Sequence, residues 1–167
     1  MARSRAACVV LAIALLGSAA WGWSAGGRGA AVFDATVVRT IDGDTIVVAL
    51  PGAHGRVETV RILGADTPET KDPRKPVQCY GPEASAYTHA RLPAGRRVRL
   101  ETDAETRDKY GRLLAYVYVD GARYDDELLR LGYARLLIIP PNGKHARPML
   151  EAELSARAQR LGLWSAC

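Results

Sequence analysis

The chain has 167 residues, of which 48% are hydrophobic and 25% are charged, and its formal net charge is +5. This length and composition are typical of one globular domain with a hydrophobic core, and they exclude a disordered chain and a fibrous repeat. The sequence after residue 31 contains no internal repeat, low-complexity tract or linker, so we predict one domain over residues 31–167.

The first thirty residues have the pattern of a secretory signal peptide. Arg3 and Arg5 precede an apolar stretch, residues 6–16, and small residues follow it at 17–20. The apolar stretch is shorter than the roughly 20 residues of a membrane span, which disfavours an uncleaved anchor. We therefore predict a signal peptide over residues 1–30, cleaved between about 20 and 31, and a mature protein that is secreted or held in the cell envelope without stable membrane association.

Cleavage would change both the charge and the cysteine count. Three basic residues and no acidic residue would leave, which lowers the formal net charge from +5 to +2. Cys8 would leave as well, so that Cys79 and Cys167 remain in an oxidising compartment, where two cysteines favour a disulfide. Two free thiols are the alternative, because the sequence does not give the distance between their Cα atoms.

The elements expected in chain order are first strands and then mostly helices. β-Branched runs separated by the turns at Asp42-Gly43 and Pro51-Gly52 predict a three-stranded meander. The expected strands are 37–40, 45–50, 57–63, 98–101 and 113–119, and the expected helices are 81–92, 125–131 and 147–161. The last helix is indicated by Leu150, Leu154 and Ala158 at helical spacing.

This order of elements predicts an α+β fold. Five strands carry a helix after the third, and strands do not alternate with helices as they do around a parallel sheet. The arrangement favours a small closed five-stranded β-barrel of the OB-fold type with three helices.

Four acidic residues stand close to the most apolar runs of the chain. Asp42 has a sufficient structural role, because Asp-Gly is a preferred centre of a tight hairpin turn. Asp44 stands at the start of a predicted strand, where a β-branched residue is usual. Asp66 and Glu69 flank Thr67-Pro68, whose proline fixes a turn. Each alone could be a surface charge or a helix cap, but two loops that bring carboxylates together form a site for Ca²⁺ or a similar hard cation.

Two arginines complete the candidate site. Arg61 lies within the apolar strand "VRIL", and a guanidinium there needs an anionic partner to offset its burial. Arg112 follows the turn "RDKYG". Either could form a structural ion pair alone, but a metal, a carboxylate and two arginines around one pocket are the components of a phosphodiester-cleaving site.

Seven separated motifs then support a family resemblance. In order they are "IDGDT", "VRILGADTPET", "YGPEASAYT", "DKYGRLLAYVY", "GYA", "PN" and "GLWS". Their order and spacing make residues 37–165 similar to the staphylococcal nuclease, or thermonuclease, family. The resemblance implies an OB-fold enzyme that hydrolyses DNA and RNA with Ca²⁺ and leaves 3′-phosphate and 5′-hydroxyl ends. It also implies that Asp44, Asp66 and the Thr67 carbonyl bind Ca²⁺. We further predict a monomer, since the sequence gives no sign of an oligomer, and a preference for single-stranded or flexible substrates.

The resemblance assigns the remaining roles residue by residue. It implies that Glu69 holds or deprotonates the attacking water and that Arg61 and Arg112 bind the scissile phosphate. Lys109 and Tyr110 match positions that contact the terminal phosphate of a bound nucleotide. The expected residue type is present at each of these positions.

One segment departs from the family pattern. Where family members carry tyrosines that form a wall of the nucleotide pocket, this chain has "RLLIIPPNG", one residue shorter. Ile138 and Ile139 cannot stack on a base as tyrosine does, and base stacking is worth about 1–3 kcal/mol per base. We therefore expect a change in base affinity and preference, and none in the chemistry at the phosphate.

Other residues and another class of function complete the expectations. Trp164 is expected to pack the C-terminal tail, and His54, His89 and His145 to be surface residues without metal-ligand spacing. The alternative function is a non-catalytic OB-fold module that binds single-stranded nucleic acid or a protein, because a fold does not by itself imply chemistry.

Overall fold

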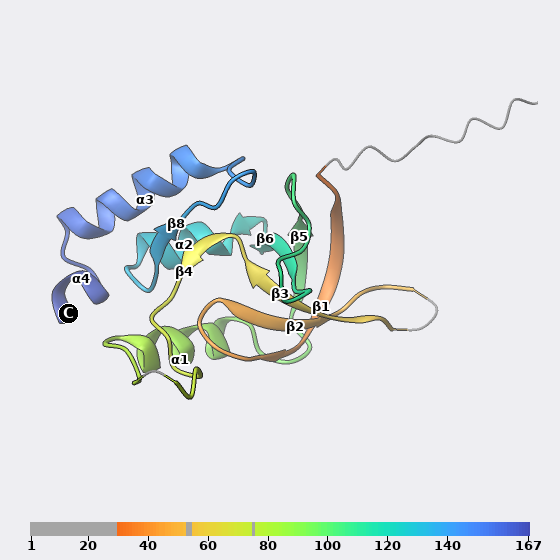
Figure 1. Cartoon of the computed structure of the whole chain (residues 1–167), viewed down its shortest axis with the longest axis horizontal. Helices are drawn as coiled ribbons and strands as arrows, with labels where there is room; N and C mark the ends of the chain where they lie inside the picture. The colour runs from red at the N-terminus through yellow and green to blue at the C-terminus, as the bar shows by residue number, and fades with distance from the viewer. Residues whose placement is uncertain (1–29, 53–54, 75) are drawn as a thin grey trace, which may run out of the picture.

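The computed structural model describes residues 30–52, 55–74 and 76–167 (Figure 1). The predicted signal peptide, apart from Ala30, and His54 lie outside the described residues. Within the described part of the chain, no helix is both long and apolar enough to cross a membrane.

Five strands close into a barrel, which confirms the predicted OB-type α+β fold. The antiparallel order is β3-β2-β1-β5-β6, and a parallel pairing of β3 with β6 closes the barrel. A short strand, β7, extends β6 as a hairpin. The strands are β1 (Val32–Thr40), β2 (Thr45–Ala49), β3 (Val57–Ile62), β5 (Arg97–Glu101), β6 (Leu113–Val119) and β7 (Ala122–Arg123).

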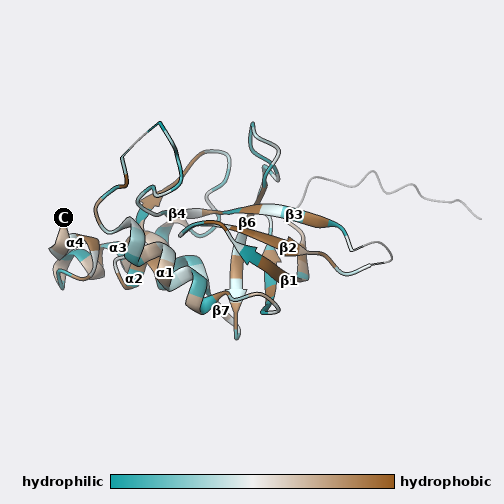
Figure 2. Cartoon of the chain, turned by 90° about the horizontal axis from the view of Figure 1, so that it is seen from below, coloured by the Kyte–Doolittle hydropathy of each residue, from teal (hydrophilic) through white to brown (hydrophobic). Residues whose placement is uncertain are grey.

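The hydrophobic core fills the barrel and continues under the helices. Alternate residues of the barrel strands point into the core, as the period-2 geometry of a strand requires. Fully buried examples are Ile46 and Val48 of β2, Val60 of β3 and Leu100 of β5. The register of β1 shifts between Val37 and Arg39, and such a bulge bends a strand so that it can pair with both β2 and β5. Figure 2 shows the resulting apolar strands beside the more polar helices.

The four helices of the described residues gather at one side of the barrel (Figures 1 and 2). Three of them confirm the predicted helices to within three residues at either end, and α2 packs against both β6 and α3. The sequence did not indicate α4 or the two-stranded sheet of β4 and β8, because these elements are too short to show a period. The bounds are α1 (Gly81–Arg91), α2 (Tyr124–Arg130), α3 (Ala146–Ala158), α4 (Leu163–Ala166), β4 (Gly64–Asp66) and β8 (Arg135–Leu137).

The buried face of α3 differs from the one that the sequence indicated. Leu150 and Leu154, at the spacing that predicted the helix, are 44% and 51% exposed, whereas Met149 and Ala152 are buried. Met149 packs over Gly64 so closely that a Cβ atom at Gly64 would lie 2.1 Å from its Cε. The small Gly64 therefore selects the methionine face of the helix.

His145 is also not the surface residue that we predicted. Its ring packs edge-on against Tyr116, with 4.6 Å between centroids, and its Nε2 lies 3.0 Å from a carboxylate oxygen of Glu101. Glu101 is buried and also accepts hydrogen bonds from Lys144 and from the Tyr118 hydroxyl. Burial alone would raise the pKa of Glu101, but these donors outweigh it and lower the pKa to about 2.

The Glu101 cluster generates a stability prediction. Glu101→Gln removes the charge that three donors share, and we expect it to lower the free energy of unfolding at neutral pH by about 1–3 kcal/mol. The native pKa of Glu101 lies below its ordinary value of 4.5, so the contribution is complete above that pH and decreases as pH falls toward about 2. Urea unfolding of both proteins across this range measures the difference. A difference that stays constant through the acid range would contradict the assignment.

Candidate active site

The site begins at the turn between β1 and β2. Gly43 lies against the loop after β4, and a Cβ atom there would lie 2.5 Å from Thr67 Oγ1. The Thr88 hydroxyl on α1 donates a hydrogen bond of 2.8 Å to the Gly43 carbonyl. The turn is therefore held between α1 and the loop, and the glycine permits this close approach.

Asp44, at the start of the second strand, is buried with both carboxylate oxygens engaged. Its Oδ2 accepts hydrogen bonds from the Thr67 N–H at 2.8 Å and the Thr67 hydroxyl at 2.9 Å. Its Oδ1 accepts one from Thr45 at 3.1 Å and lies 3.3 Å from Arg61 Nε. A carboxylate with this many partners has a fixed orientation, and it ties the start of β2 to the loop that begins at Thr67.

Arg61 connects the two aspartates. Its Nη2 lies 2.8 Å from Asp66 Oδ1, and its Nε faces Asp44. Its Nη1 donates hydrogen bonds to the carbonyls of Ile62 and Ala65 at 2.7 and 2.6 Å. One guanidinium therefore joins the second, third and fourth strands, and Asp44 and Asp66 point toward the same place.

The acidic residues of this site repel one another. Burial raises the pKa of Asp66, and the charge of Asp44 raises it further, while Arg61 opposes both effects. Burial and the Asp44 charge likewise raise the pKa of Asp42, and Glu69 adds to the increase. Excess negative charge on hard oxygen atoms is suited to a hard divalent cation.

The donor set limits how such a cation could be held. Among the described residues, no group of three or more His, Cys, Asp or Glu side chains is arranged to hold a metal ion. A cation at Asp44 and Asp66 would therefore take backbone carbonyls and water as its further ligands, as Ca²⁺ commonly does. The residues fit a hard cation on these terms, and they do not form the nitrogen and sulfur set that zinc prefers.

Glu69 lies at the start of the loop after β4, and its side chain is turned toward that loop. Its Oε1 accepts hydrogen bonds from the backbone N–H groups of Thr70, Lys71 and Asp72 at 2.8, 2.6 and 3.1 Å. These bonds, led by that of Lys71, lower the pKa of Glu69 against the effect of burial. Among the described residues, no hydrogen bond or ion pair joins Glu69 to Asp42, Asp44 or Asp66, although its charge raises the pKa of Asp42 and of Asp66.

Arg112 lines a cavity that Arg61 also lines. Its Nε lies 2.7 Å from Asp108 Oδ2, and its guanidinium lies 5.5 Å from the centre of the Tyr110 ring. Arg61, Arg112, Lys109 and Tyr110 line one cavity of about 420 Å³. Arg61 is therefore the residue that the carboxylate cluster and the cavity share.

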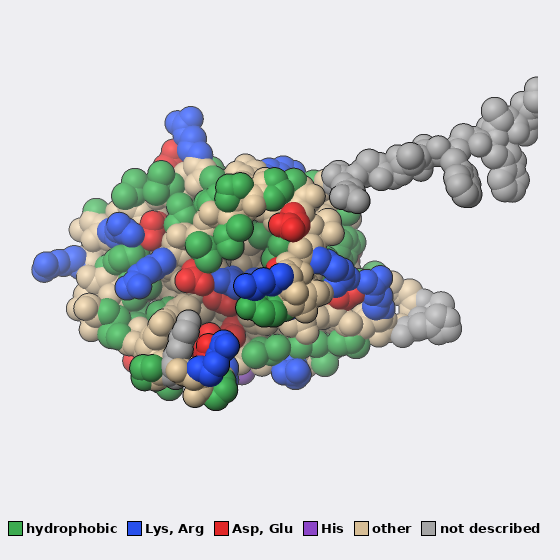
Figure 3. Space-filling model, in the orientation of Figure 1, with side chains coloured by type: hydrophobic (Ala, Val, Ile, Leu, Met, Phe, Trp, Pro, Cys, Tyr) green, Lys and Arg blue, Asp and Glu red, His purple; other side chains and the backbone are tan. Residues whose placement is uncertain are grey.

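The cavity also has an apolar side. Its lining also includes the aliphatic side chains of Leu114, Leu137, Ile138 and Ile139, and Ile139 is 62% exposed. Aliphatic side chains therefore occupy the segment in which the sequence departs from the family pattern. Figure 3 shows acidic and basic side chains side by side in the middle of one face, with hydrophobic side chains around them.

Three residues near the site were not predicted to belong to it. The turn alone is sufficient to explain Asp42, but its Oδ1 accepts a hydrogen bond from the Asp44 N–H, and the Asp44 charge raises its pKa. Arg135 of β8 pairs directly with Asp66 of β4 and lowers the pKa of that aspartate. Gln78 receives the Glu69 N–H on its side chain. Only Asp42 could have been assigned to the site from the sequence, because it lies two residues from Asp44. Arg135 and Gln78 come near the site through contacts that depend on the fold.

Comparison with known proteins gives one consistent result. The family model described as "Staphylococcal nuclease homologue" matches residues 59–166. The thermonuclease of Staphylococcus intermedius is 44% identical over 77% of this chain and 74% of its own length, and that of Staphylococcus hyicus is 38% identical over 96% and 92%. Endonuclease YncB of Bacillus subtilis is 45% identical over 78% of this chain and 61% of its own length.

The close approach of Gly43 to Thr67 generates a second prediction. Gly43→Ala forces the Thr67 side chain away from Asp44, and we expect a loss of about 1–3 kcal/mol in the free energy of unfolding, as for other overpacked sites. Gly143→Ala is the matched control, because the nearest atom to its added Cβ would lie at an ordinary 3.6 Å. Denaturant titration of both variants measures the contrast, and equal losses would show that the approach is not tight.

Proposed function

Because the chain belongs to the staphylococcal nuclease family and is a nuclease, we propose that it hydrolyses phosphodiester bonds of DNA and RNA with Ca²⁺. The products would carry 3′-phosphate and 5′-hydroxyl ends. The observation that carries the proposal is the contact of Arg61 with both Asp44 and Asp66 at the edge of the cavity that Arg112 lines. This arrangement supports the proposal, because it brings the proposed anionic metal ligands next to a proposed phosphate-binding cation.

Asp44, Asp66 and the Thr67 carbonyl are the residues that would hold the metal. Asp44 is fixed by Thr67 and Thr45, while the side chain of Asp66 is half exposed and open to a ligand. When bound, Ca²⁺ would polarise a phosphoryl oxygen and offset the repulsion between the carboxylates. Burial raises the pKa of Asp66 and the Asp44 charge adds to the increase, so a bound cation would favour the ionised form of Asp66.

The two arginines would bind the scissile phosphate from β3 and from the turn that precedes β6. The Arg61 guanidinium is fixed by two backbone carbonyls, so its position does not depend on the substrate. Arg112 is oriented by Asp108, whose pKa is lowered by that same arginine despite burial, so that it stays ionised. Two preorganised cations stabilise the charge that develops on the phosphoryl oxygens in the transition state.

Glu69 would hold or deprotonate the attacking water. While its Oε1 accepts three backbone hydrogen bonds its basicity is low, because those bonds stabilise the charged form. Accepting a proton therefore requires the carboxylate to exchange some of these donors for the water. The position of the loop that carries Glu69 then bears directly on the rate.

The rest of the cavity would set substrate affinity. Lys109 and Tyr110 would contact a terminal phosphate, and Ile138 and Ile139 would offer a base an aliphatic surface in place of a stacking partner. We propose single-stranded or flexible strands as the preferred substrate and a monomer as the active form. We also propose that the protein acts outside the cytoplasm, in the medium or in the cell envelope.

A calcium titration tests the proposed reaction against a binding module. Purified protein incubated with denatured DNA is expected to cleave it when calcium is added and to stop when a chelator removes the metal. Binding of the same DNA without calcium-dependent cleavage would contradict the proposal and support a non-catalytic OB-fold module.

Substitution of one arginine tests the site itself. Arg61→Lys keeps the charge but loses the planar fork, and we expect kcat to fall by about 10²–10³-fold, the cost typical of a lost transition-state donor. Arg99→Lys is the control, because Arg99 forms an exposed pair with Asp34 on the barrel. Steady-state kinetics on denatured DNA, with folding checked by circular dichroism, measures both. Equal kcat values for the two variants would contradict the proposed role of Arg61 in the reaction.

A further inference from the structure

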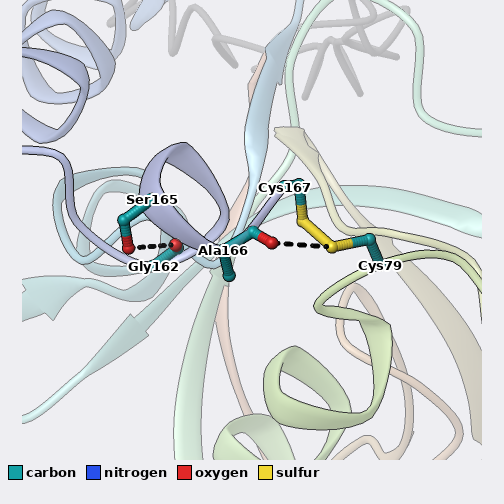
Figure 4. The surroundings of a disulfide bond; sticks show 5 residues. All are labelled: Cys79, Gly162, Ser165, Ala166 and Cys167. Atoms are coloured by element: carbon teal, nitrogen blue, oxygen red, sulfur yellow. Dashed lines mark hydrogen bonds between the residues drawn. A yellow bond between two sulfur atoms is a disulfide. The ribbon is translucent and has the colours of Figure 1, made fainter.

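A disulfide joins the loop that carries Glu69 to the C-terminal end of the chain. Cys79 and Cys167 are bonded, with 2.17 Å between their sulfur atoms and 6.0 Å between their Cα atoms (Figure 4). They lie 88 residues apart in sequence, and both are exposed. The bond can therefore be reached by small reductants and oxidants in the folded protein.

Local hydrogen bonds and attachments at its ends, rather than secondary structure, hold this loop in place. The described residues between Thr67 and Tyr80 form no helix or strand, and Lys71, Arg74 and Val77 are exposed. A loop of this length without its own hydrophobic core is held by its attachments.

Two attachments connect Glu69 to the cysteine. The Glu69 N–H donates to Gln78 Oε1 at 2.8 Å, and the Gln78 N–H donates to the Glu69 carbonyl at 2.9 Å. Gln78 directly precedes Cys79. Gly81 then lies under the loop, where a Cβ atom would be 3.3 Å from the Glu69 carbonyl oxygen. A displacement at Cys79 would therefore reach Glu69 through its hydrogen-bonded neighbour.

The other end of the disulfide is fixed to the helices. A Cβ atom at Gly162 would lie 2.3 Å from the Gly132 carbonyl oxygen, which also accepts the Leu163 N–H at 2.9 Å. Leu163 is buried, and the Trp164 ring lies 4.2 Å from the guanidinium of Arg157. The tail is thus packed in place by contacts that do not involve the sulfur atoms.

We propose that the Cys79–Cys167 disulfide positions Glu69 for the reaction, so that the nuclease reaches its full rate only after these two cysteines are oxidised. The inference rests on the proposed role of Glu69. The disulfide holds Cys79 against the packed C-terminal tail. Gln78, next to Cys79, then holds the Glu69 backbone through its two hydrogen bonds. Cys79 and Cys167 are positioning residues, since they would act on the reaction through Gln78 and Glu69.

The oxidation is an ordinary thiol–disulfide exchange. Two thiols and one molecule of glutathione disulfide would give the protein disulfide and two molecules of glutathione, so that the protein loses two electrons and two protons to the oxidant. Cytosolic thiols stay reduced, whereas exported proteins meet an oxidising environment. A chain retained in the cytosol would therefore be a weaker nuclease than the same chain after export.

A double-mutant cycle tests this inference. The four proteins are the wild type, Glu69→Gln, the Cys79→Ser/Cys167→Ser variant, and the variant with all three substitutions. We expect loss of the disulfide to lower kcat by about 10–100-fold in the wild-type background, the cost of a misplaced catalytic group, with a smaller change in KM. In the Glu69→Gln background the same loss should change kcat by less than about twofold, because the group being positioned is already absent.

The outcomes separate the two proposals. An equal loss of kcat in both backgrounds, or no loss in either, would overturn the positioning role while leaving the proposed function intact. Full activity of Glu69→Gln with its disulfide present would overturn the proposed role of Glu69, and this inference with it. Thermal midpoints are measured for all four proteins, and Val119→Ala, a buried barrel substitution, serves as a control for destabilisation alone.

Two further measurements keep the test independent of folding. Dithiothreitol followed by glutathione disulfide should lower and then restore kcat in the wild type and leave the cysteine variant unchanged. Gln78→Ala keeps the disulfide but removes the acceptor of the Glu69 N–H, and it should lower kcat in the same direction. Unchanged kcat under reduction, with the thiols shown to be free, would contradict the inference.

Discussion

The contact of one guanidinium with two carboxylates holds this molecule's site together. Arg61 faces Asp44 on one side and Asp66 on the other, and its remaining donors bind the carbonyls of Ile62 and Ala65. A buried cation is costly without such partners, and a buried carboxylate is costly without its cation. The end of the third strand, the start of the second and the whole of the fourth are therefore constrained by the same charge. Because these strand segments meet at Arg61, Asp44 and Asp66 both face its guanidinium, and Arg61 also lines the cavity.

The molecule combines this rigid centre with a loop of a different character. The barrel and the Arg61 cluster fix the proposed metal ligands and phosphate-binding groups from strands that pair along their length. Glu69 instead stands on a loop that depends on Gln78, Gly81 and the disulfide. One site can combine preorganised binding groups with an adjustable proton-transfer group. Electrostatic stabilisation needs fixed dipoles, whereas proton transfer needs the carboxylate to exchange hydrogen bonds.

Much of this could be predicted from the sequence, for physical reasons that differ by element. The barrel strands and the longer helices have clear periods, and Arg61 in an apolar strand already required an acid nearby. The β4–β8 pair, the contact of Arg135 with the site and the buried face of α3 could not be predicted, because they depend on which distant residues meet. The close approach at Gly64 limits where Met149 can lie, and His145 is partly buried because it packs against Tyr116 and Glu101. The signal peptide, and the roles assigned to individual site residues, remain predictions.

Calcium binding measured by isothermal titration calorimetry tests the central claim most directly, since that claim is that Asp44 and Asp66 serve one ion beside Arg61. The account predicts one calcium ion per chain. It also predicts that Asp44→Asn and Asp66→Asn each weaken binding at least about tenfold, and that together they weaken it by less than the product of their separate effects. Two independent calcium sites, or binding that neither substitution changes, would contradict the account.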